Sequence, residues 1–211
     1  MKIEIWSDYV CPFCYMGKTA FEEALDKFPQ KEKLDIEFKS YQLDPNTPPY
    51  TGQNFYEGMA EKFGGVEKSK QMMSGIAEQA KASGLDLQFD TMKPANTFDA
   101  HRLLKFAREH KKDFALLDKI FYAYFTESKD IGNSEVLASL SEDVGLDKAE
   151  ALTVLQDKDT FAKEVHTDIK EARQFGITSV PSFVFNRKFL VSGAQSVDAF
   201  TEALNKLVNE A

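Results

Sequence analysis

Two cysteines three positions apart are the residues of this sequence whose types and spacing point most directly to chemistry. The segment Cys11-Pro12-Phe13-Cys14 is a C-x-x-C motif and contains both cysteines of the 211-residue chain. Two cysteines are too few for a framework of structural disulfides. At this spacing they predict either a redox-active thiol pair or half of a metal site. A pair of inert buried cysteines is the third interpretation, but packing alone gives little reason for two cysteines that bracket a proline.

A metal site at the pair would need two further ligands. The three histidines, His101, His110 and His166, all lie in a region with a helical pattern, and the last two are expected to face solvent. We therefore expect no metal there. No glycine-rich phosphate-binding motif follows a predicted strand, so the sequence implies neither a nicotinamide nor a flavin cofactor.

The cysteines are expected where a strand gives way to a helix. Lys2 to Trp6 alternates charged and apolar residues, which predicts a strand, and Pro12 suits the first turn of a helix. Cys11 would then be the N-cap, where free backbone N–H groups and the positive helix end lower the thiol pKa below about 8.5. Cys14, one turn later, should point inward and resolve the mixed disulfide that Cys11 forms.

The rest of the chain predicts a sheet interrupted by helices. Alternation from Leu34 to Leu43 predicts a second strand, which completes a βαβ unit. From about Thr51 to Phe175 the apolar period is helical, and glycines and prolines divide this stretch into about six helices. Strands are predicted again at 182–185 and 188–191, followed by a helix that Ser196 can cap.

This order predicts an α/β fold in two domains. Neither strand group is large enough to be stable alone, so both are expected in one sheet. We predict a discontinuous domain of residues 1–52 and 177–211, and an inserted helical domain of residues 53–176.

The arrangement resembles a known fold. A C-x-x-C at the first strand–helix junction, with Val180-Pro181 just before the third strand, resembles the thioredoxin fold. The long helical insertion resembles the DsbA family. Three further stretches, Asn96–Leu103, Gly176–Phe183 and Ser192–Gln195, are similar to its FrnE-like branch. That branch is also related to 2-hydroxychromene-2-carboxylate isomerases and kappa-class glutathione transferases.

The resemblance implies a thioredoxin-like site built around the cysteine pair. It implies that Cys11, Cys14 and Pro181 are catalytic, with a cis Val180–Pro181 bond whose backbone pairs with an extended substrate; a trans proline in a plain loop is the alternative. It places His101 on a helix that overlooks the cysteines, although a buried structural histidine is an equal alternative. The implied substrate-binding residues are Pro12, Phe13, Asn96, His101, Val180 and Gln195.

Two features bear on the reduction potential. Pro12 and Phe13 add no positive charge between the cysteines, and Asp8 places a negative charge nearby. We therefore expect a less acidic Cys11 than in relatives with a histidine there, and a potential between roughly −120 and −270 mV. The first strand offers Ile3 and Ile5 where many thioredoxin-fold proteins have a buried acid, so a proton relay through that strand is not expected.

The composition limits the classes of partner that the protein is expected to bind. With 26 basic and 34 acidic residues, the formal net charge is −8 and no basic stripe is present, which argues against nucleic acid. The first residues lack the continuous apolar run of a signal peptide, and no long apolar run predicts a membrane span, so a cytoplasmic location is expected.

Three functions follow from these patterns. The leading one is a cytoplasmic thiol–disulfide oxidoreductase that acts on protein or low-molecular-weight substrates, with no bound cofactor and with glutathione as a candidate thiol partner. The second is a glutathione-dependent isomerase or transferase for small aromatic compounds, although such relatives typically carry serine in place of Cys11. The third is a non-catalytic redox-sensing binding module. Relatives of this kind include dimers, so a homodimer is possible.

Overall fold

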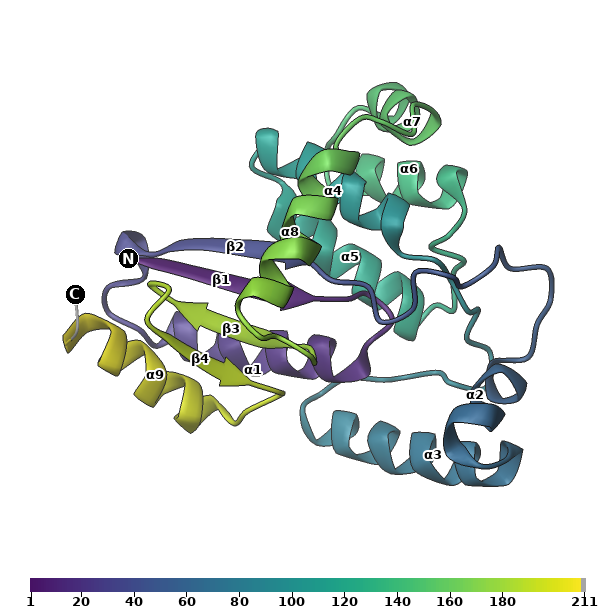
Figure 1. The fold of residues 1–211 in the computed structure, drawn as a ribbon, viewed down its shortest axis with the longest axis horizontal. Coiled ribbons are helices and arrows are strands. Elements are labelled where there is room, and N and C mark those ends of the chain that lie inside the picture. The colour runs from purple at the N-terminus through teal and green to yellow at the C-terminus, as the bar shows by residue number, and fades with distance from the viewer. Residues whose placement is uncertain (210–211) are drawn as a thin grey trace. The chain divides into compact units, whose positions relative to one another are not determined.

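The computed structural model describes residues 1–209 and has the predicted α/β architecture (Figure 1). In chain order its elements are β1 (Lys2–Ser7), α1 (Pro12–Asp26), the short 3-10 helix η1 (Lys31–Lys33), β2 (Asp35–Ser40), α2 (Phe55–Phe63), α3 (Val66–Ala82), α4 (Phe98–Glu109), α5 (Asp113–Phe125), α6 (Ser134–Asp143), α7 (Lys148–Gln156), α8 (Ala162–Gln174), β3 (Ser182–Phe185), β4 (Phe189–Ser192) and α9 (Val197–Asn209).

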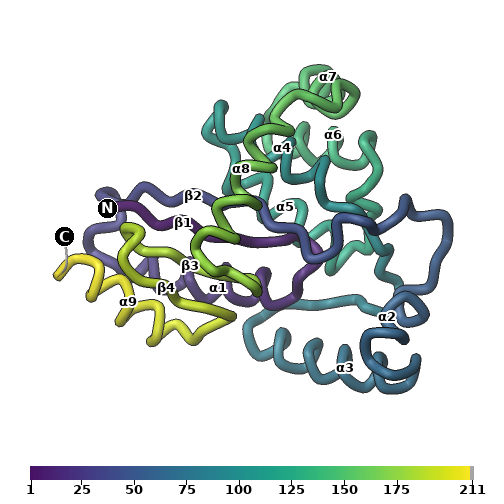
Figure 2. The backbone as a smooth tube through the Cα atoms, in the orientation of Figure 1, coloured from purple at the N-terminus to yellow at the C-terminus, as the bar shows by residue number. Residues whose placement is uncertain are grey.

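The chain divides into two compact units. Met1–Tyr41 and the chain from His166 onward form the first unit, and Gln42–Val165 forms the second. The chain leaves the first unit after β2 and returns to it within α8 (Figure 2). Both crossings come earlier in the sequence than the expected boundaries at 52 and 177, because β2 is short and most of α8 belongs with the sheet.

One four-stranded sheet forms the centre of the first unit, in the order β2-β1-β3-β4. β1 and β2 are parallel, whereas β1–β3 and β3–β4 are antiparallel, as the βαβ and ββα patterns predict. β2 ends at Ser40, not at Leu43 as expected, because its partner β1 ends at Ser7 and offers no further residues for pairing. Asn186 and Arg187, both with positive φ, make the predicted hairpin turn.

An aromatic core fills one face of this sheet, where α1 and α9 pack (Figure 1). Ile3 and Ile5 of β1 are fully buried on this face. Phe21 of α1, Phe183 of β3 and Phe200 of α9 meet with ring centroids 4.6–5.4 Å apart. The alternating pattern of β1 thus directs its isoleucines towards α1, the helix that carries the cysteines.

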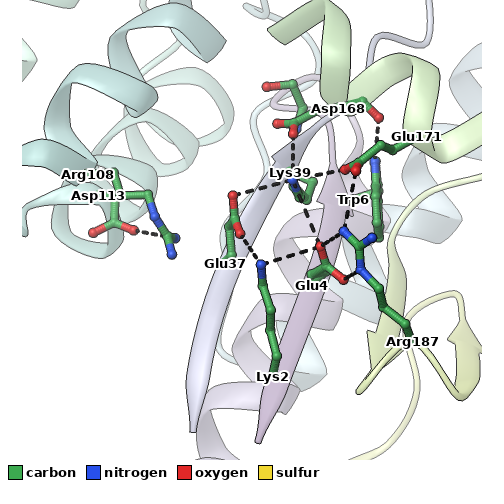
Figure 3. A network of polar contacts seen from close by, with 11 residues as sticks. Lys2, Glu4, Trp6, Glu37, Lys39, Arg108, Asp113, Asp168, Glu171 and Arg187 are labelled. Atoms are coloured by element: carbon green, nitrogen blue, oxygen red, sulfur yellow. Dashed lines mark hydrogen bonds and ion pairs between the residues drawn. The ribbon is translucent and has the colours of Figure 1, made fainter. Parts of the chain in front are cut away.

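Charged side chains cover the opposite face of the sheet, beneath α8 (Figure 3). Glu4 is 1% exposed and accepts two hydrogen bonds from Arg187, at 2.9 and 2.8 Å. Lys39 pairs with Asp168 at 2.9 Å and with Glu171 at 3.1 Å. β1 therefore does contain a buried acid, which the focus on Ile3 and Ile5 overlooked, but its partners are cations of this network.

Asp168 joins α8 to the end of β2. Its carboxylate accepts hydrogen bonds from Lys39 Nζ and from the backbone N–H of Ser40, both at 2.9 Å. Its backbone carbonyl accepts the indole N–H of Trp6 at 2.8 Å. Burial acts to lower the pKa of Lys39, but Asp168 and the neighbouring carboxylates outweigh it and raise that pKa above the usual lysine range. Lys39 is therefore charged in this buried position.

The second unit is helical. Over residues 51–175 the structure has seven helices, α2 to α8, in place of the expected six or so. Arg102 of α4 is fully buried and donates hydrogen bonds to four backbone carbonyls of the α7 end and the segment after it, at Val154, Leu155, Asp157 and Thr160. It also pairs with Asp99 at 3.1 Å. One side chain thus fixes the end of α7 to α4.

Candidate active site

Cys11 is the N-cap of α1, as predicted from Pro12. Its backbone is extended, with φ −93° and ψ 111°, and Pro12 occupies the first turn. The backbone N–H of Cys14 donates to the Cys11 carbonyl at 3.0 Å, which closes the first turn of the helix. The Cys11 sulfur therefore lies beside the backbone N–H groups of Phe13 and Cys14 at the start of the helix.

The two sulfurs lie in different surroundings. Both cysteines are free thiols, not joined in a disulfide. Cys11 is 5% exposed, and Cys14 is 1% exposed. The backbone of Asp8 contacts both cysteines: its carbonyl accepts the N–H of Cys11 at 3.1 Å, and its N–H donates to Sγ of Cys14 at 3.5 Å. The loop between β1 and α1 thus orients the pair through main-chain groups.

Their pKa values move in opposite directions. A hydrogen bond from the Cys14 thiol lowers the pKa of Cys11, and the N–H groups of Cys14 and Phe13 add to this effect. Burial and the negative charge of Asp8 oppose it, but the net pKa of Cys11 lies below the usual cysteine value. Burial, followed by the interaction with Cys11, raises the pKa of Cys14 well above that value. Of the two thiols, Cys11 is therefore the one that ionises more readily.

The loop before β3 faces Cys11. The Val180–Pro181 peptide bond is cis, as predicted, and the sulfur of Cys11 lies 3.6 Å from the carbonyl oxygen of Val180. The N–H of Gly193 donates to the Pro181 carbonyl at 2.8 Å. The structure therefore brings together the N-cap cysteine, the Val180-Pro181 pair and the turn at Gly193.

The remaining predicted residues of the first unit lie at the surface or near it. Phe13 is 38% exposed and Pro12 is partly exposed. Gln195 is exposed, and its side-chain N–H donates to the Ser192 carbonyl at 2.7 Å, so it shapes the turn after β4.

Asn96 and His101 belong to the second unit. The Asn96 side chain accepts the N–H of Phe98, at the start of α4, and donates to the carbonyls of Pro45 and Thr47. These bonds explain its conformation without a substrate. His101 is buried within α4.

Gly17, which sequence analysis did not single out, also belongs to this part of the chain. It lies buried inside α1, one turn beyond Cys14. A Cβ atom there would be 3.0 Å from Cγ of Pro181. The available signal was a glycine in a helix interior, where alanine is ordinarily more stable.

Two findings concern other classes of site. Within residues 1–209, no group of three or more His, Cys, Asp or Glu side chains is arranged to hold a metal ion. Among the helices of the same residues, none is long and apolar enough to cross a membrane.

Known proteins resemble this chain over nearly its full length. A family model described as "DSBA-like thioredoxin domain" matches residues 2–205 of this chain. The uncharacterized protein YwbO of Bacillus subtilis is 29% identical over 207 residues, which cover 97% of this chain and 96% of YwbO.

Solved structures agree with this match. The crystal structure of a probable DsbA oxidoreductase from Streptomyces coelicolor superimposes with a TM-score of 0.93 and 37% identity, covering 100% of this chain and 91% of that one. A cytosolic disulfide reductase, DsbM of Pseudomonas aeruginosa, solved with GSH, has the same fold: the TM-score is 0.71 at 16% identity, covering 99% of this chain and all of DsbM.

Proposed function

The chain belongs to the DSBA-like thioredoxin domain family, and from that membership we propose that it is a cytoplasmic thiol–disulfide oxidoreductase with Cys11 as nucleophile and Cys14 as resolving thiol. The observation that carries the proposal is the position of Cys11 at the N-cap of α1, with Cys14 one turn later and the Val180 carbonyl 3.6 Å from the Cys11 sulfur. The lowered pKa of Cys11 favours the attacking thiolate. The raised pKa of Cys14 keeps that thiol protonated until the mixed disulfide has formed.

The reaction proceeds through two exchanges. The Cys11 thiolate attacks one sulfur of a substrate disulfide, forms a mixed disulfide and releases the other substrate sulfur as a thiolate. Cys14 then loses its proton to that thiolate or to water and attacks the Cys11 sulfur. The products are the Cys11–Cys14 disulfide and a substrate with two thiols, so two electrons have passed from protein to substrate.

Val180 and Pro181 are proposed to bind the substrate backbone next to the sulfur. The Val180 carbonyl already lies within contact distance of Cys11 Sγ, so an extended chain paired with Val180 would place its disulfide at the nucleophile. The exposed ring of Phe13 offers apolar contact on the side of α1. Asn96, His101 and Gln195 remain proposed substrate contacts.

Glutathione is the proposed thiol that returns the pair to its reduced form. Two glutathione molecules reduce the Cys11–Cys14 disulfide and leave as one glutathione disulfide, which balances the electrons. The likeness to the reductase solved with GSH supports this choice of thiol. A cytosolic glutathione poise of about −220 to −260 mV keeps most such pairs reduced, which favours reduction or isomerisation of substrates over net oxidation.

The test is disulfide reduction with single-cysteine variants. Wild-type protein should reduce insulin with glutathione as the electron source, and Cys11→Ser should abolish the reaction. Cys14→Ser should accumulate a mixed disulfide at Cys11, seen by mass spectrometry as an adduct that dithiothreitol removes. Unchanged insulin reduction by Cys11→Ser would refute the proposal.

A further inference from the structure

Two rigid neighbours crowd any side chain that would replace the hydrogen of Gly17. A Cβ atom at this position would lie 3.0 Å from Cγ of Pro181 and 3.3 Å from Cα of Ala194. The first is part of a proline ring and the second is backbone, so neither can swing aside as a flexible side-chain tip would. Any substitution must therefore move α1 and these neighbours apart by a few tenths of an ångström.

The other glycines inside helices are not restricted in this way. Gly58 of α2 and Gly75 of α3 have no atom within 4 Å of an added Cβ. Helix propensity favours alanine over glycine at all three positions. The crowding is therefore specific to Gly17, where α1 approaches the loop that faces the cysteines.

The neighbours of Gly17 belong to the segments that surround the contact between Cys11 and Val180. The N–H of Gly193 donates to the Pro181 carbonyl at 2.8 Å, which ties the turn at 193–194 to the loop before β3. α1 rests on both through Gly17, while Cys11 at the start of the same helix lies 3.6 Å from the Val180 carbonyl. The separation at position 17 therefore acts directly on the distance between the Cys11 sulfur and the Val180 carbonyl.

We propose that Gly17 is a positioning residue for disulfide exchange, whose missing side chain fixes the distance between the Cys11 sulfur and the Val180 backbone. The proposal rests on the proposed function, because this distance matters only if a substrate chain pairs with the Val180 backbone and presents its disulfide to Cys11. A longer distance would hold a peptide paired with Val180 away from the sulfur.

This role separates two kinds of Cys11 reactivity. The hydrogen bonds and the charge that shift the pKa of Cys11 come from Asp8, Phe13 and Cys14, on the same loop and first helical turn, and Gly17→Ala leaves these groups in place. Alkylation of Cys11 by iodoacetamide should keep its rate and pH profile. Exchange with a peptide disulfide, which needs alignment against Val180, should slow by about tenfold, mainly through a higher KM.

The experiment compares four full-length proteins: wild type, Gly17→Ala, Gly75→Ala and Gly17→Ala with Ala194→Gly. Gly75→Ala is the matched control, since it makes the same change in an open helix position, and should equal wild type in both reactions. The double variant removes only the Ala194 Cβ, which at 3.5 Å is in ordinary van der Waals contact with the added methyl group. It keeps the close contacts with Pro181 Cγ and Ala194 Cα, so it should exchange as slowly as Gly17→Ala.

Each outcome decides between the two proposals. If wild type exchanges disulfides and Gly17→Ala does so equally well, the positioning role is refuted and the proposed function stands. If Gly17→Ala changes the alkylation profile as much as the exchange rate, the substitution disturbs the helix start and the positioning role is again refuted. If wild type performs no exchange, the proposed function fails and the role of Gly17 fails with it.

Discussion

The sulfur of Cys11 lies 3.6 Å from the carbonyl oxygen of Val180, although 169 positions separate these residues in the chain. The N-terminus of α1 and the loop before β3 thus form two sides of one site. On the helix side, the pKa of Cys11 depends on its partner Cys14 and on Asp8.

Removal of the Cys14 thiol should raise the pKa of Cys11. The hydrogen bond from Cys14 is the largest influence on that pKa and acts to lower it. Cys14→Ala removes the donor, whereas Cys14→Ser keeps a hydroxyl group that can still donate. The pH profile of iodoacetamide alkylation should therefore move to higher pH in Cys14→Ala and by less in Cys14→Ser. Equal profiles in wild type and Cys14→Ala would contradict this.

Removal of the Asp8 charge should make the protein a stronger oxidant. The negative charge of Asp8 acts to raise the pKa of Cys11, so Asp8→Asn should lower it. A more stable thiolate favours the reduced form and makes the reduction potential less negative. The potential can be measured in glutathione redox buffers, with the exposed Asp35→Asn as control. A more negative reduction potential in Asp8→Asn would contradict this effect of the Asp8 charge on Cys11.

Glu4→Gln should destabilise the protein near neutral pH and reduce its sensitivity to acid. Burial acts to raise the pKa of Glu4, but the hydrogen bonds from Arg187 and the charges of Lys2, Arg187 and Lys39 lower it overall. The stability that this carboxylate contributes is therefore present above its unfolded pKa of about 4.3 and is lost as the pH falls through the lower folded value.

The expected loss in Glu4→Gln is about 1–3 kcal/mol at pH 7, because Arg187 and Lys39 lose a buried anion. Urea unfolding of wild type and variant between pH 3 and 7 measures it, and the difference should shrink towards the acid end. Glu32→Gln, at an exposed position of η1, is the control. A constant difference across this pH range would mean that the charge of Glu4 is not the cause.

Arg102→Lys should loosen the segment after α7. Lysine cannot reproduce the planar set of donors with which Arg102 reaches four backbone carbonyls. We expect tryptic cleavage after Lys158 to accelerate by about tenfold, equivalent to about 1.4 kcal/mol of local stability. Arg108→Lys, which alters a partly exposed pair with Asp113, should leave this cleavage unchanged. Equal rates in wild type and Arg102→Lys would contradict the bracing role of Arg102.

The elements next to the cysteines could be predicted because their signals are local. Pro12 after Cys11 predicts a helix start, and Cys11 is the N-cap. Alternation in β1 predicts a strand with buried isoleucines, which the structure confirms. The position of Val180-Pro181 before β3 predicted its cis bond through the family resemblance, and the bond is cis.

The features that sequence analysis missed depend on contacts between distant segments. Nothing near Glu4 indicates that Arg187 will cover it, so its burial could not be read from the alternation of β1. The end of β2 at Ser40 depends on the length of β1, not on the apolar pattern that runs on to Leu43. Gly17 stands in a helical pattern like any other glycine, and only the nearby Pro181 ring reveals its constraint.

The hydrogen bond between Asp168 and the backbone of Ser40 has a consequence for how such a chain can change over evolution. It joins the last residue of β2, where the chain departs for the Gln42–Val165 unit, to the turn of α8 that follows the return. The exit and re-entry points are thus neighbours, held by one carboxylate. Lengthening, trimming or replacing the intervening segment therefore requires no break in the sheet.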